Sequence, residues 1–363
     1  MSKIVIDARE WSTSTGRYIS GLVRRLEKTD TENDYTILLK PRDMKNWQPA
    51  SANFQKLACP YKEFTFSEQL GFKKQLDGLR ADLVHFGMVQ QPVRYKGKTV
   101  TTMNDLTTLR FDNPSKNSLV FKVKQRIYGW VNRKVAKKAS HIITYSQFVK
   151  DDVVNYTHVN PDKITAIPLA ADQIAEPAEA LTALEGKQFI MYVGRPTPHK
   201  NLERLIKAYA SLRAQHPELM LVLAGKKDAN YERIENDVRR QAIKGVVFTG
   251  FVSEGRLRWL YENCAAYVFP SLSEGFGLPG LEAMLHGAPV VSSNATCLPE
   301  VYGSAAHYFD PLDTQAMSDA INEVLTDKEL RENLFKKGKV QAAKYSWQKT
   351  AQQTLEVYKK ALV

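Results

Sequence analysis

Short runs of β-branched and other apolar residues alternate along the chain with longer stretches that carry apolar residues at helical spacing. This alternation is typical of parallel sheets in which a helix follows each strand. In the first half the expected strands are Ile4–Ala8, Tyr35–Leu39, Leu83–Phe86, Thr99–Met103, His141–Thr144 and Ile164–Ile167. The helices expected between them are Gly16–Lys28, Ser67–Leu79, Leu119–Lys138 and Gln147–Tyr156.

A composition break separates two such halves. Residues 174–187 are rich in Ala and Glu and are interpreted as a linker. The strand-like runs then restart as Phe189–Val193, Leu221–Ala224, Val246–Phe248, Ala266–Phe269 and Pro289–Val291. We therefore predict an α/β protein with two Rossmann-like, doubly wound parallel-sheet domains, residues 1–173 and 188–346, in which ligands bind at the carboxyl ends of the strands. Residues 347–363 are predicted to form a terminal helix that returns to the first domain.

Composition narrows the class of protein. A length of 363 residues, 43% hydrophobic and 25% charged, fits two globular domains. No apolar run approaches the roughly 18 residues that span a bilayer, and the chain begins with a strand-like segment, so a cytoplasmic protein is expected. Cys59, Cys264 and Cys297 form no Cys-x-x-Cys pair, which favours neither a disulfide framework nor zinc. The net charge of +12 suggests an anionic partner: nucleotide diphosphates, anionic lipids and nucleic acids all qualify.

The most informative segment of the second half runs from Phe269 to Glu282. A strand ends there, a glycine-rich turn follows, and a helix is expected to begin near Pro279. Backbone N–H groups at a helix start bind diphosphates. Carboxylates such as Glu274 and Glu282 would repel a diphosphate but accept hydrogen bonds from vicinal diols. A diphosphate with a diol at each end describes a nucleotide sugar.

A second motif, Gly194-Arg195 followed by Lys200-Asn201, comes directly after the first strand of the second domain. Arg195 and Lys200 can neutralise the charge that develops on a departing diphosphate. Asn201 is expected to cap the helix that follows.

One alternative cofactor comes from Gly275–Gly280, which formally matches the G-x-G-x-x-G dinucleotide fingerprint. The match lies late in its domain, and the acidic residue expected about 20 positions later is represented only by Glu300 in a Leu-Pro-Glu turn. An NAD-dependent oxidoreductase is therefore the weaker alternative.

At these residues the chain resembles the retaining glycosyltransferases of family 4 (glycosyl transferases group 1, mannosyltransferase-like). Glu274 and Glu282 match that family's E-x7-E element, and the Gly194–Asn201 segment matches its G-R-x4-K-N element. The resemblance implies a GT-B fold, with two Rossmann-like domains facing across a cleft. It also implies a retaining, metal-independent hexosyltransferase of polysaccharide biosynthesis that needs no cofactor. The sequence contains no Asp-x-Asp motif that would hold a cation beside a diphosphate.

The resemblance further implies substrates and residue roles. The donor would be a nucleotide-diphosphate sugar such as GDP-mannose or a UDP-sugar, with mannose favoured, and the acceptor a glycan or a lipid-linked glycan. The catalytic residues implied are Glu274, Arg195, Lys200 and Asn104. The donor-binding residues implied are Glu282 at the ribose, Gly275, Phe276, Gly277 and Leu278 at the sugar and phosphate, Gly250 and Phe251 at the base, and Gly16 in the first domain.

Gly16 and Asn104 of the first domain depart from the family pattern. Gly16 stands alone where many relatives carry two glycines, and Arg17 beside it is either a phosphate contact or a surface residue. Asn104 occupies the place of a family histidine, and asparagine can hydrogen-bond a hydroxyl but cannot titrate. A slow enzyme or a catalytically silent nucleotide-sugar-binding protein is therefore the second alternative. Asp105 is expected to order its loop, and His85 to be an interior histidine.

Basic residues cluster in segment 116–138 and alternate with apolar ones. Such a pattern suits an amphipathic helix on an anionic membrane surface, which would place the protein peripherally at the inner face, near a lipid-linked acceptor. The preferred interpretation is a solvated helix face with Trp130 in the core. No nucleic-acid partner is expected, because no recognisable binding motif accompanies the charge.

Overall fold

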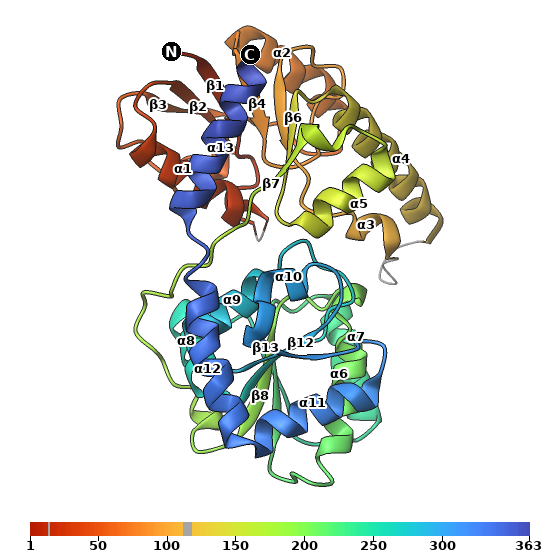
Figure 1. The fold of residues 1–363 in the computed structure, drawn as a ribbon. Helices are drawn as coiled ribbons and strands as arrows, with labels where there is room; N and C mark the ends of the chain where they lie inside the picture. Colours follow the sequence, from red (N-terminus) through yellow and green to blue (C-terminus); the bar gives the residue numbers. More distant parts are fainter. Residues whose placement is uncertain (14, 112–117) are drawn as a thin grey trace. The chain divides into compact units, whose positions relative to one another are not determined.

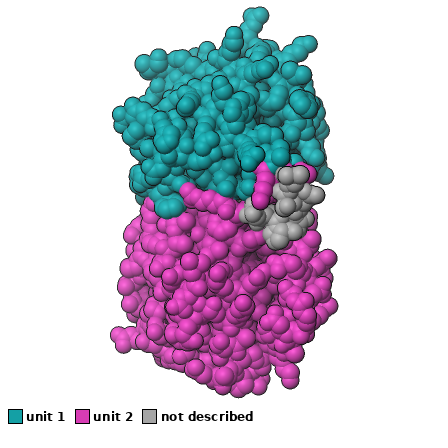
Figure 2. Space-filling view, turned by 90° about the vertical axis from the view of Figure 1, so that its right-hand side faces the viewer, with its two compact units in different colours: residues 1–109, 123–169, 346–363 teal, residues 110–122, 170–345 magenta. Residues whose placement is uncertain are grey.

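The protein consists of two units, each built on a parallel sheet (Figure 1). The structure, a computed structural model, describes residues 1–13, 15–111 and 118–363, so Ser14 and the start of the basic segment 116–138 lie outside the described residues. Unit 1 contains residues 1–109, 123–169 and 346–363, and unit 2 contains residues 110–122 and 170–345 (Figure 2).

Unit 1 contains a seven-stranded parallel sheet with strand order β3-β2-β1-β4-β5-β6-β7. Its strands are β1 Lys3–Asp7, β2 Asp34–Leu39, β3 Phe54–Ala58, β4 Leu83–Phe86, β5 Thr99–Thr102, β6 His141–Thr144 and β7 Ile164–Ala166. The edge strand β3 was not predicted from the sequence. Phe54 is its only fully buried residue, so the segment lacks the continuous apolar run that marks the central strands.

Helices cover both faces of this sheet, as a doubly wound fold requires. The helices of this part of the chain are α1 Gly16–Thr29, α2 Lys73–Leu79, α3 Thr107–Arg110, α4 Ser118–Lys138, α5 Gln147–Thr157 and α13 Trp347–Leu362. A π-helical turn, Glu68–Phe72, precedes α2. Helix α13, at the end of the chain, packs against α1 and strands β4, β5 and β6 of unit 1.

An interior histidine joins α13 to the sheet. His85 on β4 is fully buried, with its Nδ1 2.6 Å from the Tyr358 hydroxyl of α13 and its Nε2 2.9 Å from Thr102 Oγ1. Burial lowers the pKa of His85 to about 3. The interpretation of His85 as an interior residue is therefore confirmed. The placement of Trp130 in the core is wrong, because half of this side chain is exposed on α4.

Unit 2 contains a six-stranded parallel sheet with strand order β10-β9-β8-β11-β12-β13. Its strands are β8 Phe189–Val193, β9 Met220–Ala224, β10 Val246–Gly250, β11 Ala266–Phe269, β12 Val290–Ser293 and β13 Ala306–Phe309. Its helices are α6 Leu202–Leu212, α7 Ala229–Arg240, α8 Glu254–Asn263, α9 Leu278–Leu285, α10 Leu298–Tyr302, α11 Thr314–Thr326 and α12 Lys328–Ala342. The prediction of two doubly wound parallel sheets is confirmed.

The central strands form the cores of the two units. All four residues of β4 and all four of β11 are buried, because helices cover both faces of each sheet. Among the described residues, no helix has both the length and the apolar character needed to cross a membrane.

Candidate functional site

Three glycines lie at the carboxyl edge of the unit 2 sheet: Gly194 and Gly225 follow strands β8 and β9, and Gly250 is the last residue of β10. The Gly194 N–H donates to the Ala224 carbonyl at 2.9 Å, and the Gly225 N–H donates to the Gly250 carbonyl at 3.0 Å. A Cβ atom on Gly225 would lie 2.2 Å from the Gly194 carbonyl oxygen, a distance that no side chain tolerates. Bare backbone therefore lines this edge. Sequence reasoning missed Gly225, although a glycine after a strand also marked Gly194.

The two cations after β8 have different surroundings. Lys200 Nζ lies 2.5 Å from Glu274 Oε1, and both side chains are largely buried, with 19% and 12% exposed. The Arg195 guanidinium is 66% exposed and lies 3.7 Å from Asp228 Oδ2. Lys200 is thus held against a predicted sugar-binding carboxylate, whereas Arg195 is free to reorient.

Asn201 links the turn after β8 to the loop after β11. Its backbone is left-handed, with φ of 61°, and its side chain makes no capping hydrogen bond to α6. Instead its Nδ2 donates to the carbonyls of Pro270, at 3.0 Å, and Pro311, at 2.7 Å. Asn201 therefore occupies the N-cap position that the sequence predicted, but its side chain makes no capping bond, because its Oδ1 accepts from Arg204 Nη1 at 2.9 Å.

The loop that carries Glu274 is fixed by contacts along its backbone. The Glu274 N–H donates to Thr296 Oγ1 at 3.2 Å, and the Cys297 thiol lies 3.2 Å from the Glu274 carbonyl. The Leu272 N–H donates to the His199 carbonyl at 2.7 Å, which ties this loop to the turn that carries Lys200. The ion pair between Lys200 and Glu274 is therefore part of a rigid arrangement of two loops.

The glycine-rich turn ends at helix α9. Gly277 is its N-cap residue, with φ of 96°, and Pro279 lies in the first turn, as the sequence predicted. The described part of the chain offers no backbone acceptor to the N–H groups of Phe276 and Gly277. Unpaired N–H groups at a helix start form an anion-binding site.

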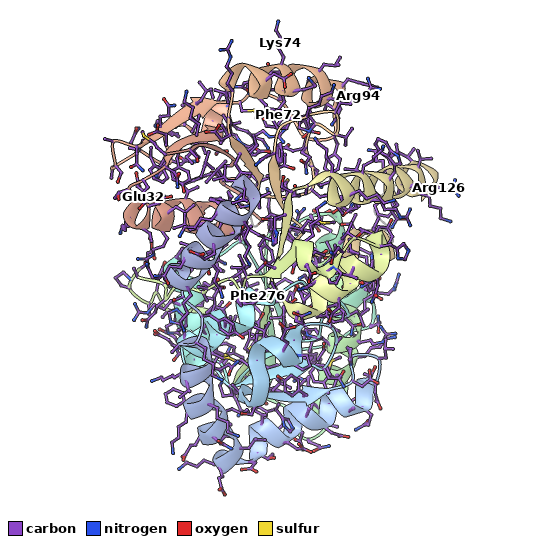
Figure 3. All side chains as sticks on the ribbon, turned by 45° about the horizontal axis from the view of Figure 1, so that its top comes forward. Glu32, Phe72, Lys74, Arg94, Arg126 and Phe276 are labelled. Atoms are coloured by element: carbon purple, nitrogen blue, oxygen red, sulfur yellow. The ribbon has the colours of Figure 1, made fainter. Side chains whose placement is uncertain are left out.

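Tyr302 packs against this turn through its hydroxyl group. Its hydroxyl donates to the Gly277 carbonyl at 2.5 Å, and a Cβ atom on Gly280 would lie 2.3 Å from the same hydroxyl oxygen. The Phe276 ring is buried and packs edge-on against Tyr345, so its side chain points into the protein (Figure 3). Only the backbone of this turn is therefore presented to a ligand.

Three further predicted donor-binding residues are Glu282, Gly250 and Phe251. Glu282 in α9 is 5% exposed, with Oε2 3.4 Å from the Tyr261 hydroxyl. The Gly250 N–H donates to the Tyr231 hydroxyl at 3.0 Å, and the neighbouring Phe251 is 83% exposed. An exposed aromatic ring after β10 is suited to stacking on a nucleobase.

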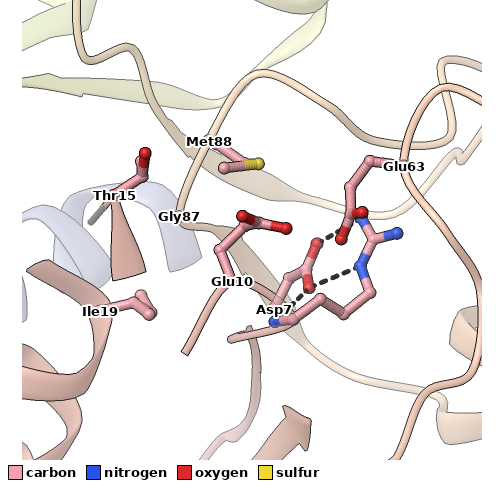
Figure 4. Close-up of a pocket in the computed structure, with 8 residues that line it drawn as sticks. Asp7, Glu10, Thr15, Ile19, Glu63, Gly87 and Met88 are labelled. Carbon is pink, nitrogen blue, oxygen red and sulfur yellow. Dashed lines mark hydrogen bonds and ion pairs between the residues drawn. The ribbon is translucent and has the colours of Figure 1, made fainter. Parts of the chain in front are cut away.

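Unit 1 has a pocket at the carboxyl ends of β1 and β4 (Figure 4). The residues that line it are Asp7, Arg9, Glu10, Thr15, Ile19, Glu63, Gly87 and Met88. Lys40 Nζ lies 2.9 Å from Glu10 and 2.8 Å from Glu63. Sequence reasoning assigned no role to these carboxylates, although the Asp7-Ala8-Arg9-Glu10 run directly follows a strand.

A buried ion network forms the floor of this pocket. Arg9 is 2% exposed and bonds both Asp7 carboxylate oxygens, at 2.9 and 2.8 Å, and Glu68 at 3.0 Å. Burial alone would lower the pKa of Arg9, but Asp7 and Glu68 outweigh it and raise that pKa. Arg9 is therefore a permanently charged structural residue.

The predicted first-domain residues lie near the same edge of the unit 1 sheet. A Cβ atom on Gly16 would lie 1.7 Å from the Glu10 carbonyl, so glycine lets this loop close over the start of α1. Asn104 follows β5, and its buried Oδ1 has no hydrogen-bond partner among the described residues. Asp105 accepts a hydrogen bond from the Thr107 N–H at 2.8 Å, and this contact confirms its loop-ordering role.

Solved structures share the whole architecture. The chain resembles sucrose-phosphate synthase from Thermosynechococcus elongatus with a TM-score of 0.78, 18% identity and 99% of both chains covered. It resembles HepE from Anabaena, solved in complex with UDP and glucose, with a TM-score of 0.76, 15% identity, and 99% of this chain and 100% of that one covered. Two Rossmann-like parallel-sheet units in this arrangement along the chain define the GT-B fold.

Two family models match the chain, and the boundary between them falls between the two sheets. Residues 16–173 match the family described as Glycosyltransferase Family 4, and residues 174–341 match the family described as Glycosyl transferases group 1. The chain therefore belongs to the glycosyltransferases that combine these two domains.

The curated relatives of the chain include two mannosyltransferases. The chain is 36% identical over 237 residues to O-antigen chain mannosyltransferase B of Escherichia coli, an alignment that covers 61% of each protein. It is 31% identical over 248 residues to the MMP alpha-(1->4)-mannosyltransferase of Mycolicibacterium hassiacum, with 66% of this chain and 59% of that one covered. The chain thus covers about three fifths of the length of these relatives.

Proposed function

We propose that the protein is a retaining, metal-independent glycosyltransferase that moves a hexose from a nucleotide-diphosphate sugar to a glycan or lipid-linked acceptor. The ion pair between Lys200 and Glu274, next to the unpaired N–H groups at the start of α9, carries the proposal. The loops that carry these groups provide N–H hydrogen-bond donors for an anionic diphosphate and a carboxylate that can accept hydrogen bonds from sugar hydroxyls. The similarity to two mannosyltransferases favours mannose as the sugar.

In the proposed donor complex, the diphosphate lies on the backbone of Phe276, Gly277 and Leu278. Glu282 binds the ribose diol, and Phe251 stacks on the base. Lys200 leaves its ion pair with Glu274 and turns to the diphosphate, so that the Glu274 carboxylate becomes available to sugar hydroxyls. Arg195, exposed and loosely paired, joins Lys200 as the diphosphate clamp.

In the proposed reaction, the bond between the anomeric carbon and the diphosphate oxygen breaks through an oxocarbenium-like state. Arg195, Lys200 and the start of α9 stabilise the leaving diphosphate. The acceptor hydroxyl attacks the same face of the sugar and gives its proton to a diphosphate oxygen, so the anomeric configuration is retained. No carboxylate acts as a covalent nucleophile, unlike the pair in a retaining hydrolase. Asn104 can hydrogen-bond a hydroxyl of the transferred sugar but carries no charge.

We place the acceptor at the carboxyl edge of the unit 1 sheet, where Glu10 and Glu63, beside the small pocket of Figure 4, offer carboxylates to sugar hydroxyls. A lipid-linked acceptor would bring the protein to the inner face of a membrane. The basic helix α4, from segment 116–138, is the proposed peripheral contact. We propose a cytoplasmic location on the same grounds, since nucleotide-sugar donors are anionic metabolites of that compartment.

The test is donor consumption and product formation with GDP-mannose and with UDP-sugars, comparing wild type with Glu274→Gln. We expect Glu274→Gln to lower the transfer rate by about 10²–10³-fold, the loss typical of one transition-state hydrogen-bond partner. Glu332→Gln, at an exposed carboxylate of α12, is the matched control and should leave the rate unchanged. Full activity of Glu274→Gln would overturn the assignment. Donor binding without any transfer would identify the silent binding protein instead, and selective NADH binding the oxidoreductase.

A further inference from the structure

Large apolar side chains of unit 1 are exposed on two segments that lie side by side. One is the segment from Glu63 to Leu70, which runs into the π-helical turn before α2 and in which Phe64, Phe66 and Leu70 are 71%, 88% and 69% exposed. The other is helix α4, in which Val123, Ile127 and Trp130 are 48%, 56% and 50% exposed. The Phe64 ring lies 6.4 Å from the ring of Tyr128 on α4, centroid to centroid, so the two segments are in contact. We name these six side chains the apolar patch.

The apolar side chains of α4 lie along one face. Positions 123, 127 and 130 are three and four residues apart, and such residues align along a helix. The core contacts of α4 come from another face, where Val135 and Ala136 are buried in the cluster that also contains Ile142. The exposed stripe is therefore a second apolar face that the fold of unit 1 does not use.

Segment 63–70 is held in a protruding conformation by buried charges. Phe64 has a φ of 61°, in the left-handed region that a bulky residue rarely adopts. Its N–H donates to Glu68 Oε2 at 3.1 Å, and Glu68 in turn bonds the buried Arg9. The exposure of Phe64 and Phe66 thus follows from the same ion network that forms the floor of the pocket.

Basic residues surround the apolar patch. Residues 123–138 of α4 contain Lys124, Arg126, Arg133, Lys134, Lys137 and Lys138 and no acidic residue. Arg126 projects from α4 in Figure 3. Lys62 precedes segment 63–70 and Lys74 follows it, both exposed. Burial, and then the charge of Lys73 on α2, lower the pKa of Lys138, which places like charges of the two helices near one another.

We propose that the apolar patch and its basic rim form a docking surface for a phospholipid bilayer that contains anionic headgroups. Aromatic and aliphatic side chains flanked by Lys and Arg match the interface of such a bilayer, in which rings enter the headgroup region and cations pair with phosphates. A nucleic acid would use the cations but leave the aliphatic side chains in water. The inference deepens the proposed function and rests on it for the lipid-linked acceptor, but lipid binding itself is independent of catalysis.

The test is flotation of the full chain with vesicles of phosphatidylcholine alone or with added phosphatidylglycerol. We expect wild type to float only with the anionic vesicles and to detach as salt rises. Phe66→Ser combined with Ile127→Ser should weaken binding at least tenfold, since two large apolar side chains then no longer leave water on binding. Arg126→Glu should weaken binding by about fivefold or more, at about 1 kcal/mol per basic residue near the surface.

Matched controls come from unit 2. Leu312→Ser and Lys328→Glu remove an exposed apolar residue and an exposed cation and should leave flotation unchanged. The proposal is overturned if wild type does not float, if the patch variants float like wild type, or if they instead shift the mass of a self-associated species in sedimentation. Binding of GDP and UDP, measured on the same variants, should match wild type. Loss of flotation with intact nucleotide binding then separates this surface from the proposed donor site.

Discussion

The two units have the same strand order but different edges. Counted within each unit, both sheets run 3-2-1-4-5-6, and unit 1 adds one more strand. In each, an arginine follows the end of the first strand by two positions: Arg9 after β1 and Arg195 after β8. Arg9 is 2% exposed and bonded to Asp7 and Glu68, whereas the side chain of Arg195 is 66% exposed. The same topological position therefore holds a structural ion pair in one unit and an available cation in the other.

The difference extends along both edges. In unit 2, Gly194 and Gly225 follow β8 and β9 and Gly250 ends β10, so backbone N–H and carbonyl groups line this part of the edge. In unit 1 the corresponding edge carries Glu10 and Glu63, bridged by Lys40. Bare backbone is suited to a diphosphate, and carboxylates are suited to hydroxyls. Two copies of one scaffold can thus bind different chemistry through the few residues that follow each strand.

Substitution of Arg9 and of Arg195, each in a separate variant, should give the largest difference between the structural arginine and the exposed one. Arg9→Met leaves Asp7 and Glu68 buried without their partner, and we expect a loss of about 3–5 kcal/mol in the free energy of unfolding. Arg195→Met at an exposed position should change it by less than about 0.5 kcal/mol. Chemical denaturation of both variants measures the difference. Equal losses would show that the comparison between the two arginines does not hold.

Nucleotide affinity should depend on Lys200 more strongly than on Arg195. Lys200→Met removes a clamp cation and is expected to weaken the binding of GDP or UDP about tenfold, equivalent to about 1.4 kcal/mol. Arg195→Met should have a smaller effect in the same direction, because its exposed charge is screened by solvent. Titration calorimetry on the purified variants measures both. If Arg233→Met, at an exposed cation on α7, weakens binding equally, the effect is one of net charge and not of the site.

Protonation of His85 should lower the free energy of unfolding at acid pH. Burial lowers the pKa of His85 to about 3, whereas an unfolded histidine titrates near 6.5. Between these values the unfolded state binds the extra proton, so His85 destabilises the fold as pH falls from about 6.5 towards 3, by at most about 1.4 kcal/mol per pH unit. His85→Gln should remove this component and flatten the dependence of unfolding free energy on pH. An unchanged slope in the variant would contradict the account.

Local patterns predicted most elements because each carries its own signal. The bounds of β4, β6, β8 and β11 match their apolar runs, and α13 begins at Trp347 and ends at Leu362 as the helical spacing indicated. Two of the four edge strands, β3 and β13, were missed for a physical reason. Polar residues interrupt both, Gln55 and Lys56 in β3 and His307 in β13, so neither has the short apolar run that identified the edge strand β10.

The sequence by itself determined the alternation that builds two doubly wound sheets and the separate motifs around Glu274 and Lys200. Only the tertiary structure decided that these two side chains, 74 positions apart, lie 2.5 Å from one another. It also decided that Arg9 is buried while Arg195 is exposed, and that the side chain of Asn201, the N-cap residue of α6, donates to two distant carbonyls. Local propensity and periodicity act within one element, whereas ion pairing and burial depend on which distant elements pack together.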